Sequence, residues 1–231
     1  CALHFTALRK RQVKHYGQDE EFRAYALFLL GGSFIVTLLL IVYGFFDMGH
    51  HALIKSLFNV ISLATTTGFL SASIDTWPTV VPYLITFLAI IGGCAGSTSG
   101  GIKVMRALLL GKQSMREMKR LIHPHAIITI KFGRHSLADS ILQSMWGFIS
   151  VFIASFIIIL LVLIGLGNDL VTSFACTTAS LANAGAGIGD ISLNFANLST
   201  SSKWVLMFAM LAGRLEIFSI LVLFMPQFWR K

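Results

Sequence analysis

The chain holds 231 residues, of which 55% are hydrophobic and only 12% are charged, and its mean hydropathy is +0.78. Soluble domains carry a charge on about a quarter of their residues, so this composition excludes an ordinary soluble domain and predicts an integral membrane protein. The formal net charge of +8 comes mainly from short basic stretches, which are typical of cytoplasmic loops and give little support to nucleic-acid binding.

The first half of the chain begins with a full-length and a half-length apolar segment. Residues 1–18 are mixed and basic, and we expect them to form a cytoplasmic tail. Residues 24–46 are long enough to cross a hydrocarbon core of about 30 Å and predict a transmembrane helix. Residues 51–64 are too short for that and predict a half-membrane helix. This helix ends at a glycine-containing loop, residues 65–69.

A glycine-rich string interrupts the next apolar segment, residues 80–110, which lies within an expected broken helix over residues 78–119. Five of the ten residues from Gly92 to Gly101 are glycine, and each costs a helix about 1 kcal/mol relative to alanine. We therefore expect a broken helix, whose break is either a kink for close packing or a flexible gate within the membrane. The candidate gate residues are Gly92, Gly93, Cys94, Ala95, Gly96, Ser97, Thr98, Ser99, Gly100 and Gly101.

The same order of segments recurs in the second half of the chain. Residues 137–167 predict a second crossing, and residues 170–182 predict a second half-length helix. A second glycine-containing loop follows at residues 183–187. Residues 204–229 predict an exit helix with Gly213 near its middle.

An ungapped shift of 117 residues aligns the two halves. It places Ser56 on Ser173, Gly68 on Gly185, and Gly96 on Gly213. Internal repeats are frequent in transport proteins, where the substrate path lies at the repeat interface. The predicted fold class is therefore an all-α membrane protein with two tandem repeats of helix, half-helix pore loop and helix, at residues 19–119 and 120–231.

The distribution of charge predicts the orientation in the membrane. Fifteen of the 18 basic residues lie in residues 9–23, 103–134 and 230–231, and by the positive-inside rule these segments face the cytoplasm. Both glycine-containing loops then enter from the outside. The outer segments carry Asp47, Asp75, Asp169 and Asp190 against Lys55 and Lys203. A slightly acidic mouth would concentrate cations.

The two loops are candidates for an ion filter. Backbone that is neither helical nor part of a barrel is tolerated in a bilayer only where it is buried in protein or lines a water-filled cavity. A potassium-type filter replaces the hydration shell of the ion with backbone carbonyls. We expect the carbonyls of Thr66, Thr67, Asn183 and Ala184 to bind the ion, within a filter made of Thr65, Thr66, Thr67, Gly68, Phe69, Ala182, Asn183, Ala184, Gly185 and Ala186.

Arg214 lies in the middle of the last apolar span, at a depth that matches the glycine-rich break. An ionisable residue at that depth is a functional candidate. It is either an electrostatic barrier on the pore axis or one half of an ion pair with Glu216, and the two are compatible. Lys103, just after the glycine string, is expected at the inner rim. The cysteines Cys1, Cys94 and Cys176 have no metal-site or disulfide spacing and are expected to be packing residues.

At this point several motifs carry a family resemblance. They are TTTGF, GGCAGSTSGGIK, NAGAGIG and GRLEIF, together with ALHFTALR and DEEFRAY near the start. Through them the chain resembles the C-terminal half of a bacterial Trk-type potassium uptake subunit of the Trk/Ktr/HKT superfamily. The resemblance implies four repeats around one pore, with this chain supplying the third and fourth and residues 1–16 ending the second.

The resemblance also implies roles and partners. It makes Gly68 and Gly185 the glycines of half a selectivity filter, residues 92–101 the gating loop, and Arg214 the arginine that faces this loop and helps to close the pore. Ala186 stands where proline is expected. The implied ligand is a potassium ion. The implied partners are membrane lipid, the first two repeats of the same subunit, a second copy in a homodimer, and a cytosolic nucleotide-binding regulatory ring contacting residues 9–14 and 112–134.

Three function classes remain open. The leading hypothesis is selective, gated potassium uptake across the bacterial inner membrane. The second is symport of potassium with sodium or protons, which needs a buried titratable site, for which Asp139 and Glu216 are the candidates. The third is a non-transporting scaffold or receptor, which would not need two half-helices. No Ser-His-Asp or paired-carboxylate arrangement stands out, so we do not expect an enzyme.

Overall fold

A computed structural model describes residue 17 and residues 19–46, 49–126, 128–133, 135–188, 191 and 194–229. Except for Gly17, the expected cytoplasmic tail lies outside the described residues, as do Asp47 and Asp190 of the expected acidic mouth. The described part is mostly helical, which confirms the all-α class. A short antiparallel hairpin, β1 (Lys131–Phe132) and β2 (His135–Ser136), links the two halves.

The described residues of the first half form four α-helices. These are α3 (Glu20–Val42), α4 (Gly49–Ala64), α5 (Val80–Ile91) and α6 (Val104–Ile122), with a 3-10 turn η1 (Ile74–Thr76) before α5. Helix α3 begins earlier than expected because the Asp19 carboxylate accepts a 2.8 Å hydrogen bond from the Phe22 amide and so caps the helix.

The second half repeats this arrangement. It contains α7 (Asp139–Gly165), α8 (Leu170–Leu181), α9 (Thr200–Arg214), α10 (Ile217–Phe224) and α11 (Pro226–Trp229). Asp169 caps the start of helix α8, because its carboxylate accepts hydrogen bonds from the amides of Val171 (3.1 Å) and Thr172 (3.2 Å). These two bonds satisfy amides that the helix itself leaves unpaired.

The expected exit helix over residues 204–229 is not continuous. It breaks at Leu215 and Glu216, and α10 leaves α9 at an angle of 107°. The backbone φ of Glu216 is +58°, a value that a helix cannot contain. The break lies two residues after Gly213, so local glycine content does not place it. Its cause is a long-range charge contact described below.

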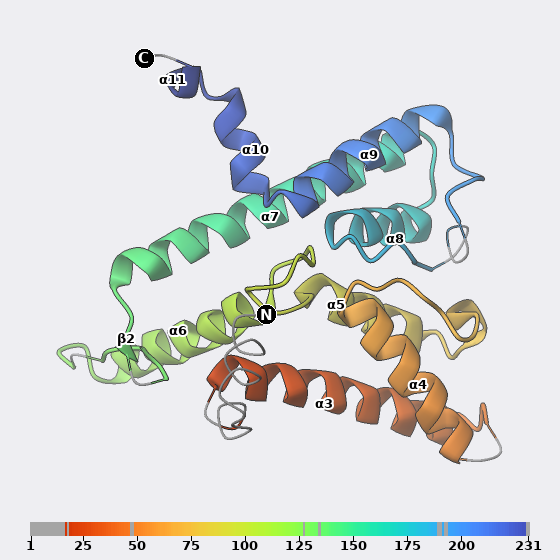
Figure 1. Ribbon diagram of the computed structural model, residues 1–231, viewed down its shortest axis with the longest axis horizontal. Coiled ribbons are helices and arrows are strands. Elements are labelled where there is room, and N and C mark those ends of the chain that lie inside the picture. The colour runs from red at the N-terminus through yellow and green to blue at the C-terminus, as the bar shows by residue number, and fades with distance from the viewer. Residues whose placement is uncertain are drawn as a thin grey trace, which may run out of the picture.

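The two halves form two packed bodies joined through α5 and α8 and through α6 and α7. Figure 1 shows α3 and α4 in the lower part of the molecule, α7 and α9 above, and α8 between them. Each body has its own apolar core. They meet where Phe87 of α5 contacts Phe174 of α8, with ring centroids 6.1 Å apart. The buried Ala184 of the second loop packs into the core of the first body. The loops are therefore held at the junction.

Two described helices are long and apolar enough to cross a membrane, namely α3 and α7. A third span results if α9 and α10 count as one bent crossing, while α5 and α8 are shorter apolar helices. Helix α3 exposes large apolar side chains such as Leu27 (75%) and Phe34 (69%). Such a face suits contact with lipid or with more protein.

Candidate ion-conduction site

The two glycine-containing loops have the same backbone conformation. In the first loop, φ is +58° at Thr66 and +84° at Gly68, and in the second it is +56° at Asn183 and +76° at Gly185. The intervening residues Thr67 and Ala184 do not have positive φ. In an ordinary strand successive peptide groups face opposite sides. A left-handed residue at every second position instead lets successive carbonyls face one side.

Both loops are tied to the helices before them by the same four hydrogen bonds. In the first loop, the amides of Thr65, Thr66, Thr67 and Gly68 donate to carbonyls of Ile61, Leu63, Ser62 and Ser62, at 2.9, 3.1, 2.8 and 3.3 Å. In the second, the amides of Ala182, Asn183, Ala184 and Gly185 donate to Thr178, Ser180, Ala179 and Ala179, at 2.9, 3.1, 3.0 and 3.4 Å. Every donor and acceptor matches its counterpart at the 117-residue shift.

The bonded amides point back into the helices. The carbonyls of the loop residues take no part in these hydrogen bonds and can face away from the helices. Helices α4 and α8 both end at the loops, and the C-terminal end of a helix carries a partial negative charge. The loops also approach each other closely, because a Cβ added at Gly68 would lie 2.6 Å from the carbonyl oxygen of Ala184. The structure thus brings residues of the first and second loops together.

Asn183 links the second loop to the glycine-rich segment. Its side-chain Nδ2 is buried and has no hydrogen-bond partner in the described part of the chain. A Cβ at Gly100 would lie 2.9 Å from this nitrogen, and a Cβ at Gly213 would lie 2.7 Å from it. Both glycines therefore leave room for the amide. Asparagine is also among the few residues that tolerate a left-handed backbone.

The glycine-rich segment is a closed loop rather than a helix kink. Residues 92–103 leave the end of α5 and return to it, because the amides of Ile102 and Lys103 donate to the carbonyls of Ile90 (2.9 Å) and Ile91 (2.7 Å). These bonds satisfy carbonyls that the helix end leaves unpaired. The return requires close backbone contact, since a Cβ at Gly101 would lie 2.5 Å from the Ile90 carbonyl oxygen.

Three contacts hold this loop against other elements. The Arg214 guanidinium donates to the Thr98 carbonyl, and the Ala95 amide donates to the Glu21 carboxylate at 2.5 Å. Gly100 packs against the second loop, because a Cβ there would lie 2.6 Å from the Ala182 carbonyl oxygen. The segment therefore lies directly beside the candidate filter, with α3 and α9 on its flanks.

The second alternative for Arg214, an ion pair with Glu216, is not what the structure shows. Glu216 instead binds Lys103 and Arg106, each at 2.8 Å. The Arg106 guanidinium also stacks 4.0 Å from the centroid of the Phe148 ring on α7. Since Lys103 is largely buried, it does not line an open inner rim. The chain turns at Glu216 so that its carboxylate can reach both cations.

Glu216→Gln is expected to loosen this junction. The neutral amide cannot compensate Lys103 and Arg106, and removing one partner of a buried ion pair costs 3–5 kcal/mol. Glu216 is 39% exposed, so we expect a smaller loss of about 1–3 kcal/mol in the free energy of unfolding. Thermal unfolding in detergent measures it. Glu117→Gln, which removes a 49% exposed carboxylate paired at the longer distances of 3.5 and 3.4 Å with Arg116 and Arg120, is the control. Equal midpoints for both variants would contradict the assigned role of Glu216.

Sequence reasoning missed three residues that shape the site. Fully buried Asn59 accepts a 2.9 Å hydrogen bond from the Ser71 amide through its Oδ1 and so holds the chain just after the first loop. Glu21 and Arg106, described above, are the others. A polar amide inside the apolar segment 51–64 is the one local signal that could have pointed to Asn59. The contacts of Glu21 and Arg106 join residues far apart in the sequence and leave no such signal.

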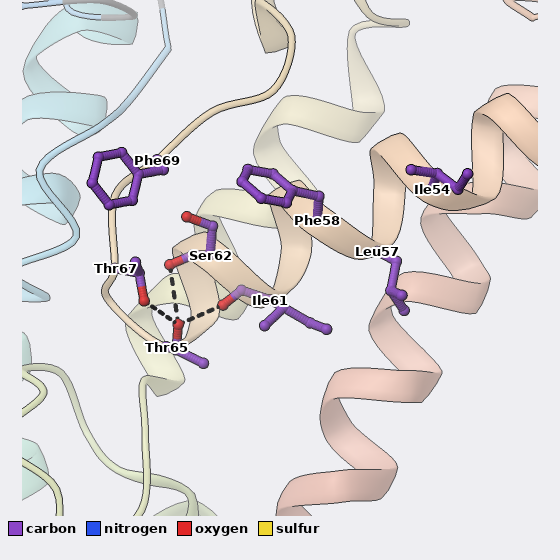
Figure 2. Close-up of a pocket in the computed structure, with 8 residues that line it drawn as sticks. All are labelled: Ile54, Leu57, Phe58, Ile61, Ser62, Thr65, Thr67 and Phe69. Carbon is purple, nitrogen blue, oxygen red and sulfur yellow. Dashed lines mark hydrogen bonds between the residues drawn. The ribbon is translucent and has the colours of Figure 1, made fainter.

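An open pocket of about 420 Å³ lies beside the first loop (Figure 2). Its lining includes Phe58, Ile61 and Ser62 of α4 and Phe69 of the loop, which is 70% exposed. At the 117-residue shift the first three correspond to Ala175, Thr178 and Ala179, which are at most 2% exposed. In the second half this face belongs to a core that Tyr83 and Ile90 of α5 help to cover.

The fold and the site define a helical membrane protein built from tandem repeats of helix, half-helix and helix. Residues 4–231 match the family described as TrkH, cation transport protein. The chain therefore belongs to this family, which confirms the resemblance inferred from the motifs.

Individual relatives agree with this assignment. The chain is 45% identical over 229 residues to the Trk system potassium uptake protein TrkH of Salmonella typhimurium, covering 99% of this chain and 47% of that protein. It is 33% identical over 229 residues to the Trk system potassium uptake protein TrkG of Escherichia coli (strain K12), with the same shares. These names describe uptake proteins and not enzymes, as the sequence predicted.

A solved structure is similar over the whole chain. It is that of the potassium transporter TrkH from Vibrio parahaemolyticus, with a TM-score of 0.94 and 41% sequence identity, covering 99% of this chain and 49% of that one. The chain thus spans about half the length of the relatives that it matches.

Proposed function

We propose that residues 65–69 and 182–186 form half of a selectivity filter for potassium uptake across a bacterial inner membrane. The observation that carries the proposal is the shared left-handed pattern at Thr66, Gly68, Asn183 and Gly185. It favours carbonyls of both loops facing one axis, as the replacement of a potassium hydration shell requires. The names of the relatives, which are potassium uptake proteins, support potassium as the ion.

The filter is completed by a second pair of repeats in this proposal. The pocket beside the first loop supports it, because the equivalent face of α8 is covered by the exit helix α5 of the preceding repeat. An exit helix from an earlier repeat would cover α4 in the same way. The proposal also includes a wider assembly, a homodimer docked on a cytosolic nucleotide-binding ring, which is supported only by membership of the family. The orientation with basic loops in the cytoplasm has the same support.

Residues 92–103 act as the gate in this proposal, with Arg214 holding the loop against the filter. Its contact with the Thr98 carbonyl places a positive charge beside the loop, which opposes cation entry. Arg214→Ala is expected to raise basal potassium flux several-fold in proteoliposomes. Lys203→Ala, at the outer surface, is the control and should leave flux unchanged. Unchanged or lower flux in folded Arg214→Ala protein would count against the gate.

Symport is the second candidate, and the described charges disfavour it. Glu216 is held by two cations, while Asp139 is paired with Arg116 at 2.9 Å and is exposed. Neither is a buried carboxylate free to exchange a proton. Flux measured in proteoliposomes under separate potassium, sodium and pH gradients tests the proposal. Potassium movement down its own gradient, without a co-ion, is expected, whereas a strict requirement for sodium or protons would overturn it.

A further inference from the structure

Two cavities lie along α6, one toward the first turns of α3 and one toward the β1–β2 hairpin, and together we call them the groove. The two cavities, each of about 390 Å³, share Lys112 in their linings. One lies toward α3 and is lined by Arg23, Leu27 and Leu108, and the other is lined by Lys119 and Lys131. Figure 1 shows the first half of α6 beside the start of α3.

The groove is positively charged after its internal ion pairs are counted. Lys112 is neutralised by Glu20 at 2.6 Å and also donates to the Lys131 carbonyl at 2.9 Å. Arg116 is paired with Asp139. Among the residues that the structure describes, no carboxylate lies within ion-pair distance of Arg23, Lys119 or Lys131. Lys119 and Lys131 are thus available to an anion, and Arg23, whose charge also acts on Glu20, is a third cation at the α3 end.

The apolar side of the groove distinguishes between sources of that anion. Arg23 lies in the first turn of α3, a helix long enough to span the membrane, and Leu27 lies one turn further on with 75% of its surface exposed. Leu27 and Leu108 together form the apolar end of the groove. A small cytosolic anion would contact only the basic side chains and leave the two leucines exposed. A phospholipid would place its phosphate near the cations and its acyl chain along the leucines.

We propose that this groove binds an anionic phospholipid of the cytoplasmic leaflet, with its headgroup among Arg23, Lys112, Lys119 and Lys131 and an acyl chain along Leu27 and Leu108. The site rests on the orientation proposed above but not on the filter or the gate. A bound lipid would connect α3, whose Glu21 holds the glycine-rich loop, to the hairpin.

Native mass spectrometry of the purified protein tests the site. Phosphatidylglycerol is expected to remain bound where phosphatidylcholine does not, and millimolar inorganic phosphate should not displace it. Each basic residue near an anionic membrane surface contributes about 1 kcal/mol, so Arg23→Gln with Lys119→Gln should weaken retention at least tenfold. The control, Arg120→Gln with Lys203→Gln, removes the same charge elsewhere and should not. Arg23→Lys with Lys119→Arg should retain the lipid.

Several outcomes would overturn the proposal. If the wild-type protein retained phosphatidylglycerol and phosphatidylcholine equally, the proposal would be overturned. This comparison needs no variant, so it holds even if the double variant fails to fold. Displacement by inorganic phosphate would assign the groove to a free anion. If the variant Arg23→Gln with Lys119→Gln no longer bound a soluble regulatory protein but still retained the lipid, the groove would be a protein-docking surface. None of these outcomes bears on ion selectivity, so failure here is distinguishable from failure of the filter.

Discussion

Gly68→Ala is expected to abolish the preference for potassium over sodium. The backbone φ of Gly68 is +84°, and a Cβ would lie 2.6 Å from the Ala184 carbonyl oxygen of the opposite loop. A left-handed conformation costs an L-residue about 1–2 kcal/mol, and the clash is with backbone that cannot rotate away. The two loops must therefore separate or turn their carbonyls, and either change removes the fit to the ion.

Gly185→Ala is the matched control for this effect. Gly185 has the equivalent left-handed φ of +76°, but a Cβ there would meet no atom within 4 Å. It therefore carries the backbone strain without the clash. We expect potassium and sodium uptake in cells lacking other potassium systems to show a large loss of selectivity for Gly68→Ala and a smaller one for Gly185→Ala. Equal selectivity in wild type and Gly68→Ala would refute the filter assignment.

Gly213→Ala is expected to prevent normal assembly of the second half. A Cβ at Gly213 would overlap the Leu181 carbonyl oxygen and lie 2.7 Å from Asn183 Nδ2, so α9 could not pack on the end of α8. Overpacking typically costs about 1–3 kcal/mol in the free energy of unfolding. Because the obstructing atoms belong to the backbone, we expect Gly213→Ala to cost about 3 kcal/mol or more. The yield of folded protein in size-exclusion chromatography and its thermal unfolding midpoint measure the loss.

Gly111→Ala shows what the same chemical change does in open space. Gly111 lies inside α6, and a Cβ there would meet nothing within 4 Å. Alanine is favoured over glycine in a helix by about 1 kcal/mol, so this variant should be slightly more stable than wild type. If Gly213→Ala also unfolded at or above the wild-type temperature, close packing of α9 against the loop would be refuted.

The sequence could indicate the two loops because their signal is local. Each follows an apolar helix of half-membrane length, and each contains a glycine. The structure adds that Thr66 and Asn183 are left-handed as well. No propensity predicts this for threonine, whose branched side chain disfavours positive φ. The hydrogen bonds of the loop to α4, together with Asn59, impose that conformation.

The exit helix shows where local reasoning fails. The sequence predicted one helix over residues 204–229 with Gly213 near its middle, but α9 continues through Gly213 and ends at Arg214. The chain bends at Glu216 because the carboxylate reaches Lys103 and Arg106, which are 113 and 110 residues away in the sequence. Gly213 serves a different purpose, which is to let α9 approach the second loop. Neither fact is visible in a window of neighbouring residues.

The sequence alone determined the membrane class, the two repeats, the half-length helices and the position of each loop. These follow from hydropathy, segment length and glycine content, which are properties of contiguous residues. Tertiary structure alone decided which residues turn left-handed, which partner Glu216 takes and how the glycine-rich loop is held. Those features depend on backbone and charge contacts between distant segments. The physical reason is that a single segment cannot satisfy its own helix ends, buried amides and buried charges, so their partners come from elsewhere in the fold.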